Sequence, residues 1–180
     1  MQPDGKVKIR RGMTADAHAL TGLQRASCLA AYGHIFPPDL HSFPIEATKE
    51  HRRQTLTVHE ETTLVAKREG VLERGSSPTG PTISTPLFVA PGEWGKGIGG
   101  QLHDAADHDL ASRGFERCYL WVVEKNHRAR RFYEARGSVS DDRTDTSRFP
   151  PDPRLLACQL ELPVDRGQAT LMLTGWQGSE

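Results

Sequence analysis

Apolar residues recur along this chain in two spacings, one typical of helices and one typical of strands. Helical spacing predicts an amphipathic helix over residues 14–33 and another over residues 98–114. The inner face of the first helix would consist of Leu20, Leu23, Ser27 and Ala30. The segment 45–57 is more polar and is predicted as a further helix. A short fourth helix is expected from the capping residue Asn126 to Gly137.

Short runs of apolar and β-branched residues predict the strands. These runs are residues 7–10, 62–67, 86–90, 118–123 and 155–162. The run 118–123 (CYLWVV) is almost continuously apolar, so a strand covered on both faces is expected there. Residues 71–82 contain turn formers throughout, and any strand within them is expected to be short or irregular. The segment 141–153 is rich in Asp, Thr and Pro and is predicted as a loop.

The order of these elements predicts a single domain with a mixed sheet and helices on its faces. A chain of 180 residues lies within the range of about 100–200 residues that one domain takes. The pattern predicts a domain over residues 1–162, followed by a tail of uncertain structure over residues 163–180, in which residues 170–173 could form one more strand.

The charge balance narrows the classes of partner. Lys plus Arg number 23 and Asp plus Glu also number 23, so the net charge is zero and DNA is not an expected partner. No apolar stretch approaches the roughly 18 residues of a membrane helix, and residues 1–12 do not resemble a secretory signal. The three cysteines lie far apart without CxxC spacing. We therefore expect a cytoplasmic protein without disulfides, structural metal or membrane partner.

A glycine-rich loop, GEWGKGIGG over residues 92–100, lies between a predicted strand and a predicted helix. Its amides and the N-terminus of the helix can bind phosphate or pyrophosphate, with Lys96 as an additional cation. A tight turn without a ligand is the alternative. Gly95, Gly97 and Gly100 also satisfy the GxGxxG pattern of dinucleotide-binding proteins, but too little chain follows to build such a domain.

Two motifs together resemble the GNAT acyltransferase (N-acetyltransferase) superfamily. The loop is similar to the family's pyrophosphate loop, Q/R-x-x-G-x-G/A, with Gly97 and Gly99 at the small positions and Trp94 where Gln or Arg is usual. The segment NHRARRFYEARG, residues 126–137, is similar to N-x-x-A-x-x-F-Y-x-x-x-G throughout. Two motifs at the right separation are far more specific than either alone. The resemblance extends loosely over residues 7–162.

The resemblance implies an α/β (α+β) fold with a mixed, mostly antiparallel sheet, a central pair of splayed parallel strands, and helices on both faces. Acetyl-CoA would lie between those strands, residues 87–90 and 119–123, and no metal would be needed. The residues implied in binding it are Leu87, Phe88, Val89, Trp94, Gly95, Lys96, Gly97, Ile98, Gly99, Gly100, Asn126, Arg128 and Phe132.

The activity that the resemblance implies is transfer of an acyl group, usually acetyl, to a primary amine by direct attack. Tyr133 takes the position of the family's general acid, which protonates the departing thiolate; packing against Phe132 is its alternative role. Many relatives carry a Glu on the strand before the loop, but this chain reads ISTPLFV there. Glu124 is the nearest acidic candidate for the base, with Glu93 and His103 behind it.

Three departures from the family pattern support a different class of function. The missing strand carboxylate, Trp94, and Ser138 in place of Phe or Trp would suit an acyl-CoA-binding or regulatory module with little catalysis. The acceptor of an active enzyme could be a small amine, a protein N-terminus or a lysine. Residues 32–44 and 141–153 are the segments expected to contact the acceptor, and the chain could form a homodimer.

Overall fold

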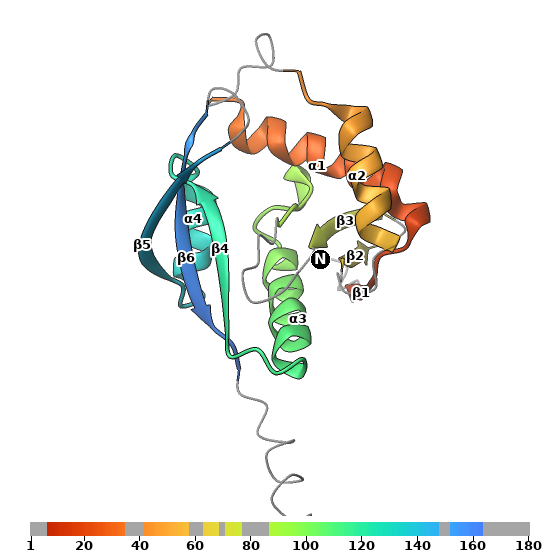
Figure 1. The fold of residues 1–180 in the computed structure, drawn as a ribbon. Coiled ribbons are helices and arrows are strands. Elements are labelled where there is room, and N and C mark those ends of the chain that lie inside the picture. The colour runs from red at the N-terminus through yellow and green to blue at the C-terminus, as the bar shows by residue number, and fades with distance from the viewer. Residues whose placement is uncertain are drawn as a thin grey trace, which may run out of the picture.

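The computed structural model describes residues 7–34, 42–57, 63–68, 71–76, 87–147 and 152–163. Within these ranges the chain forms four α-helices and two three-stranded antiparallel sheets. Figure 1 shows the two sheets on opposite sides of the molecule, with helix α3 (Ile98–Ser112) between them. No helix of the described residues is both long and apolar enough to cross a membrane.

The first sheet has the order β1-β2-β3, formed by Lys8–Arg11, Leu64–Arg68 and Val71–Ser76. Its central strand is the most apolar, and Val65 and Ala66 are fully buried. The pairing of β2 with β3 shifts register after Ala66, in agreement with the irregular strand predicted for residues 71–82, of which 77–82 lie outside the described residues.

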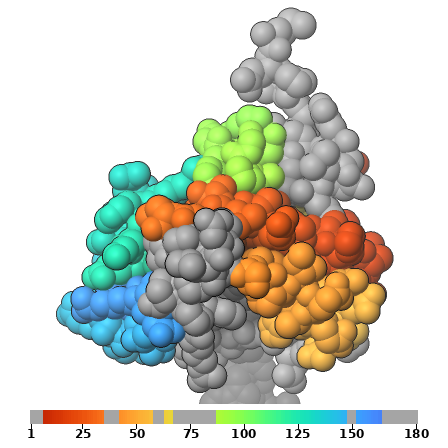
Figure 2. Space-filling model, turned by 90° about the horizontal axis from the view of Figure 1, so that it is seen from above, coloured from red at the N-terminus to blue at the C-terminus, as the bar shows by residue number. Residues whose placement is uncertain are grey.

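Two helices pack beside this sheet, α1 (Ala17–Tyr32) and α2 (Ile45–Thr57). Helix α1 places Leu20 and Leu23 in a cluster with Val65, and Ser27 is buried as well, whereas Ala30 is exposed. Seen from above, α1 crosses the molecule between α2 and the light-green segment that begins at residue 87 (Figure 2). Helix α1 therefore reaches from the first sheet to the loop before α3.

The second sheet has the order β4-β6-β5, formed by Arg117–Val123, Arg154–Glu161 and Val139–Thr146. A short helix, α4 (His127–Glu134), follows β4. The prediction of a loop over residues 141–153 is wrong for its first part, because β5 pairs with β6 there. Strand β5 is exposed on both faces along most of its length, and its register shifts between Ser140 and Thr144. An edge strand of this kind has no hydrophobic alternation to reveal it.

The central helix connects the two halves through its apolar face. Its first turns, Ile98 and Leu102, pack against Leu64 and Ala66 of the first sheet. Its last turn packs against the second sheet, where Leu110 clusters with Cys118, Leu160 and Leu162. The helical spacing predicted from Ile98 to Leu110 is therefore confirmed. The first sheet packs against the first turns of this helix, and the second sheet packs against its last turn.

The expected pair of splayed parallel strands is not present in the described residues. Residues 87–90 carry no strand pairing, and within the described residues β4 pairs only with β6, in antiparallel orientation. The two stretches instead face each other across a cavity, which Val89 lines from one side and Trp121 and Val122 from the other. The described residues therefore form an α+β fold with two separate antiparallel sheets.

Candidate active site

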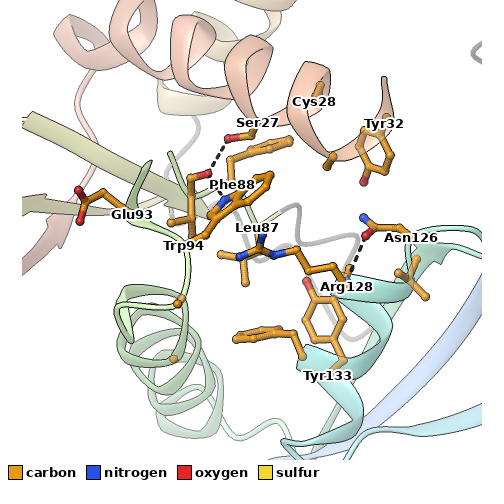
Figure 3. A pocket seen from close by; sticks show the side chains of 18 of the residues that line it. Ser27, Cys28, Tyr32, Leu87, Phe88, Glu93, Trp94, Asn126, Arg128 and Tyr133 are labelled. Carbon is orange, nitrogen blue, oxygen red and sulfur yellow. Dashed lines mark hydrogen bonds between the residues drawn. The ribbon is translucent and has the colours of Figure 1, made fainter. Parts of the chain in front are cut away.

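A cavity of about 590 Å³ opens between the two halves of the molecule. Its walls come from α1, the segment 87–100, strand β4 and helix α4 (Figure 3). The lining residues are Ser27, Cys28, Ala31, Tyr32, Leu87, Phe88, Val89, Glu93, Trp94, Gly95, Gly97, Gly99, Gly100, Trp121, Val122, Asn126, Arg128, Ala129, Phe132 and Tyr133. Both sequence motifs therefore contribute to one site.

The glycine loop forms one end of this cavity. Gly95 and Gly97 have φ values of 79° and 81°, a backbone conformation that residues with a side chain rarely adopt. Gly97 is the N-cap of α3, so the first amides of the helix begin at the cavity wall. A Cβ on Gly99 would lie 3.4 Å from the ring of Phe132, which shows how closely α3 and α4 approach each other.

Two residues of this loop that were expected to bind the cofactor do not line the cavity. Ile98 is fully buried in the core beneath the first sheet, so only its backbone could serve a ligand. The ammonium group of Lys96 lies 2.9 Å from a carboxylate oxygen of Glu93. Neither Ile98 nor Lys96 lines the cavity.

The carbonyl of Val89 anchors the opposite wall. It accepts a hydrogen bond from Ser27 Oγ at 2.9 Å and another from Trp94 Nε1 at 2.7 Å. A carbonyl oxygen has two lone pairs, so both lone pairs of this oxygen already accept hydrogen bonds from the protein. This hydrogen bond ties the indole of Trp94 to Val89, at the position where the family usually has Gln or Arg.

Arg128 reaches across the cavity from α4 to this indole (Figure 3). Its guanidinium carbon lies 3.7 Å from the centre of the Trp94 ring. Burial lowers the pKa of Arg128. Among the described residues no carboxylate pairs with this guanidinium, so the Trp94 ring is its observed partner. A cation with no carboxylate beside it, at the end of a glycine loop, is suited to a phosphate.

Helix α4 begins at a residue that also lines the cavity. The side-chain oxygen of Asn126 accepts a hydrogen bond from the amide of Ala129 at 3.1 Å and caps the helix. Asn126 also meets Tyr32 of α1: burial raises the pKa of Tyr32, while its hydrogen bond with Asn126 acts in the opposite direction. This contact connects α1 to α4 across one end of the site.

Tyr133 both packs against a neighbouring ring and lines the cavity. It is 8% exposed and packs edge-on against Phe132, with ring centres 5.1 Å apart. It also lines the cavity, and Figure 3 shows its side chain pointing from α4 into that space. The structure therefore brings the tyrosine together with the glycine loop, Asn126 and Arg128.

None of the three candidates for the general base is a carboxylate or imidazole that both lines the cavity and lacks an ion-pair partner. Glu124 follows β4 and pairs with Arg154, with 3.2 Å between nitrogen and carboxylate oxygen, and it does not line the cavity. Glu93 lines the cavity but is the partner of Lys96. His103 lies behind Phe132 and Tyr133, outside the large cavity.

One wall of the site escaped the sequence reasoning. Ser27, Cys28 and Ala31 line the cavity from α1, beside the expected Tyr32. Their spacing of one, three and four residues places them on one side of a helix, which is the signal that could have found them. Burial raises the pKa of the Cys28 thiol to about 11, against an opposing effect of the nearby Arg52. Cys28 is therefore a neutral wall residue at ordinary pH.

Comparisons with known proteins agree with this geometry. The model of the acetyltransferase (GNAT) family matches residues 26–137, and the chain belongs to this family. A probable N-acetyltransferase of Mycobacterium tuberculosis is 35% identical over 88 residues, which are 42% of this chain and about half (49%) of that relative. The phosphinothricin N-acetyltransferase of Streptomyces coelicolor is 27% identical over 148 residues, covering 74% of this chain and 82% of the relative.

Solved structures show the same fold. The PaiA N-acetyltransferase of Thermoplasma acidophilum, solved in complex with coenzyme A, superposes with a TM-score of 0.66 at 18% identity. The superposition covers 84% of this chain and 98% of that structure. The chain is thus a GNAT-type N-acetyltransferase, the family that its two motifs resemble.

Proposed function

We propose that this protein transfers the acetyl group of acetyl-CoA to a primary amine by direct attack, with Tyr133 as the general acid. The observation that carries the proposal is the convergence of Tyr133, the glycine loop and Arg128, a cation without a carboxylate partner among the described residues, on one cavity. The family match supports the reaction class. The role of each residue is inferred from its place in the cavity.

Acetyl-CoA fits this cavity by the chemistry of its walls. The amides at the start of α3 suit the pyrophosphate, since a helix N-terminus favours an anion. Arg128 would exchange the Trp94 ring for a phosphate oxygen, which gains a charge-assisted hydrogen bond. The pantetheine arm would lie along residues 87–89 and bond to their amides, because the carbonyl of Val89 already accepts two hydrogen bonds.

In the reaction, the amine nitrogen attacks the thioester carbon, a C–N bond forms and the C–S bond breaks. The amine gives up a proton and the departing sulfur gains one. We assign the second proton to Tyr133, whose hydroxyl would give its proton to sulfur and regain one from solvent. Holding amine and thioester together in one cavity would supply much of the rate.

The route of the amine's proton has two candidates. Glu124 would have to leave Arg154 and turn into the cavity before it could act as a base. A chain of waters to bulk solvent requires no such movement. The variant Glu124→Gln would distinguish the two routes. If Glu124 is the base, the variant should lose turnover at neutral pH and recover part of it at high pH.

A second function, acyl-CoA binding with little catalysis, is favoured by one observation. Among the described residues that line the cavity, Glu93 is the single carboxylate, and it is paired with Lys96. A binding module needs no base, so this arrangement would suit it. The two functions differ in turnover and not in affinity for acetyl-CoA.

For the acceptor, we propose a small amine of the amino-acid type rather than a protein N-terminus or lysine. The support is the similarity over 74% of the chain to an enzyme named for phosphinothricin. Ser27, Cys28 and Tyr32 of α1 form the cavity wall that we propose such an acceptor contacts.

The test has two stages. Calorimetric titration with acetyl-CoA, coenzyme A and NAD should show binding of the first two, whereas tighter binding of NAD would contradict the proposal. Release of free thiol is then measured against a panel of amino acids, polyamines and peptides. Turnover with an amino acid supports the enzyme, and binding of acetyl-CoA without turnover on any amine supports the module.

Tyr133→Phe tests the general acid directly. The substitution keeps the ring and its packing on Phe132, so folding and acetyl-CoA affinity should be retained. Single-turnover rates should fall by about 10²–10⁴, the usual contribution of a positioned acid. A variant with the wild-type single-turnover rate would remove Tyr133 from the mechanism.

A further inference from the structure

A buried histidine lies directly behind the candidate acid. His103, on α3, is 7% exposed, and its ring centre lies 5.8 Å from that of Tyr133 and 5.7 Å from that of Phe132. The Phe132 contact is edge-on, with 69° between the ring planes. The three rings therefore form one cluster between α3 and α4.

The imidazole of His103 is held in one orientation by a carboxylate. Its Nδ1 lies 2.8 Å from an Asp107 carboxylate oxygen, one helical turn further along α3. Because an ionised carboxylate can only accept, the hydrogen sits on Nδ1. This bond fixes the ring plane of His103, and with it the edge that Phe132 and Tyr133 contact.

A second carboxylate, that of Asp104, lies beside the pair. Asp104 lies near both groups but pairs with Arg136, whose guanidinium carbon is 5.6 Å from the centre of the Phe132 ring. Burying a polar pair costs desolvation free energy that a leucine at position 103 would avoid. Stability alone therefore gives no reason for a histidine at this position.

Tyr133 is the wall between two spaces. One is the large cavity, and the other is a small cavity of about 30 Å³ that Tyr133 lines together with His103, Asp107, Leu120 and others. On this side the Tyr133 ring faces the imidazole of His103, with 5.8 Å between the ring centres. His103 is therefore one of the side chains that bound the Tyr133 ring away from the large cavity.

We infer that His103, held by Asp107, is a positioning residue that fixes the ring of Tyr133 and so the place of its hydroxyl in the acetyl-CoA cavity. This inference rests on the proposed role of Tyr133 as general acid. A displacement of a reacting group by about 1 Å can lower a rate by about 10²-fold, so a lost contact behind the ring is expected to be measurable.

The experiment is a double-mutant cycle on the full-length chain. His103→Leu and Asp107→Ala are made in the wild type and again in Tyr133→Phe, and single-turnover rates, the KM for acetyl-CoA and Tm are measured. In the wild-type background His103→Leu should lower the rate by about tenfold, and Asp107→Ala should lower it in the same direction. The KM should stay within about twofold. In the Tyr133→Phe background neither substitution should cause a further loss.

Asp109→Ala is the matched control, because Asp109 lies on the same helix and pairs with Arg113 away from the three rings. Equal rate losses in both backgrounds, or no loss in the wild type, would overturn the inference while the acid role stands. Full single-turnover activity of Tyr133→Phe would overturn the acid role and leave His103 nothing to position. If His103→Leu does not fold, Asp107→Ala decides, since Asp107 is half-buried and its removal leaves the aromatic cluster in place.

Discussion

Arg128 and Trp94 form the most specific pair of side chains in the cavity. A guanidinium stacked on an indole gains about 0.5–2 kcal/mol, which is enough to hold an otherwise mobile side chain but less than a phosphate offers. The same residue can therefore bridge the cavity in one state and bind an anion in the other. Trp94, in place of the usual Gln or Arg, gives up a polar contact of its own and supplies a platform for Arg128.

Loss of this cation should weaken acetyl-CoA binding. We expect Arg128→Ala to raise the Kd at least tenfold, which is about 1.4 kcal/mol, and to make the affinity less sensitive to salt. Calorimetry at two salt concentrations measures both effects. Arg117→Ala is the control, because Arg117 pairs with Glu161 at the far end of β4. Equal affinities of the two variants would place the phosphates elsewhere.

The raised pKa of Cys28, about 11, predicts slow alkylation. Only the thiolate reacts, so at pH 8 iodoacetamide should modify Cys28 roughly 100-fold more slowly than an ordinary thiol. The rate should rise about tenfold per pH unit up to pH 10. Acetyl-CoA should slow the reaction further, because Cys28 lines the cavity. Peptide-resolved mass spectrometry separates Cys28 from the other two cysteines, and a rate that levels off near pH 9 would contradict the prediction.

At the scale of elements, the structure shows which patterns carry information. Helix α3 was predicted correctly because its apolar positions face two sheets and repeat over four turns. Strand β5 was missed because its residues are exposed on both faces, so pairing with β6 and not burial determines it. Residues 87–90 were predicted as a strand from their apolar run, which in fact faces a cavity and neighbouring helices.

Helix α4 should depend on its capping residue. Asn126→Ala removes the oxygen that accepts from the Ala129 amide and also the contact with Tyr32. We expect a loss of about 1 kcal/mol in the free energy of unfolding, which for a chain of this size lowers Tm by about 2–4 °C. Asn126→Asp keeps a capping oxygen and should lose less. Equal Tm values for the two variants would show that the cap contributes nothing.

At the scale of the whole molecule, sequence and fold contribute different parts of the site. The two motifs predicted that the glycine loop and α4 meet at one site, since each motif was expected to follow one strand of a neighbouring pair. That α1 lines the cavity could not be predicted. Helical spacing shows which residues share one face of a helix, but not which other element packs against that face. The direction of Glu124 was equally hidden, since its pairing with Arg154 depends on the register between β4 and β6.

The cavity lies between two halves that α3 joins, so a ligand that fills it should bind the halves together. Acetyl-CoA at about 100 times its Kd should add about 2.7 kcal/mol to the free energy of unfolding and raise Tm by about 5–11 °C. NAD at the same concentration should cause little shift. A thermal unfolding series measured by circular dichroism provides the comparison.

Two glycine variants show whether this stabilisation comes from the loop. Gly97→Val should largely abolish the shift, because Gly97 has a φ of 81° that a branched side chain strains, and because the neighbouring amides belong to the proposed pyrophosphate site. Gly92→Val is the control in the same loop: Gly92 is exposed, has no positive φ, and a Cβ there would have no atom within 4 Å. It should keep the full shift. A larger shift with NAD than with acetyl-CoA, abolished by Gly97→Val, would instead identify the loop as a dinucleotide site.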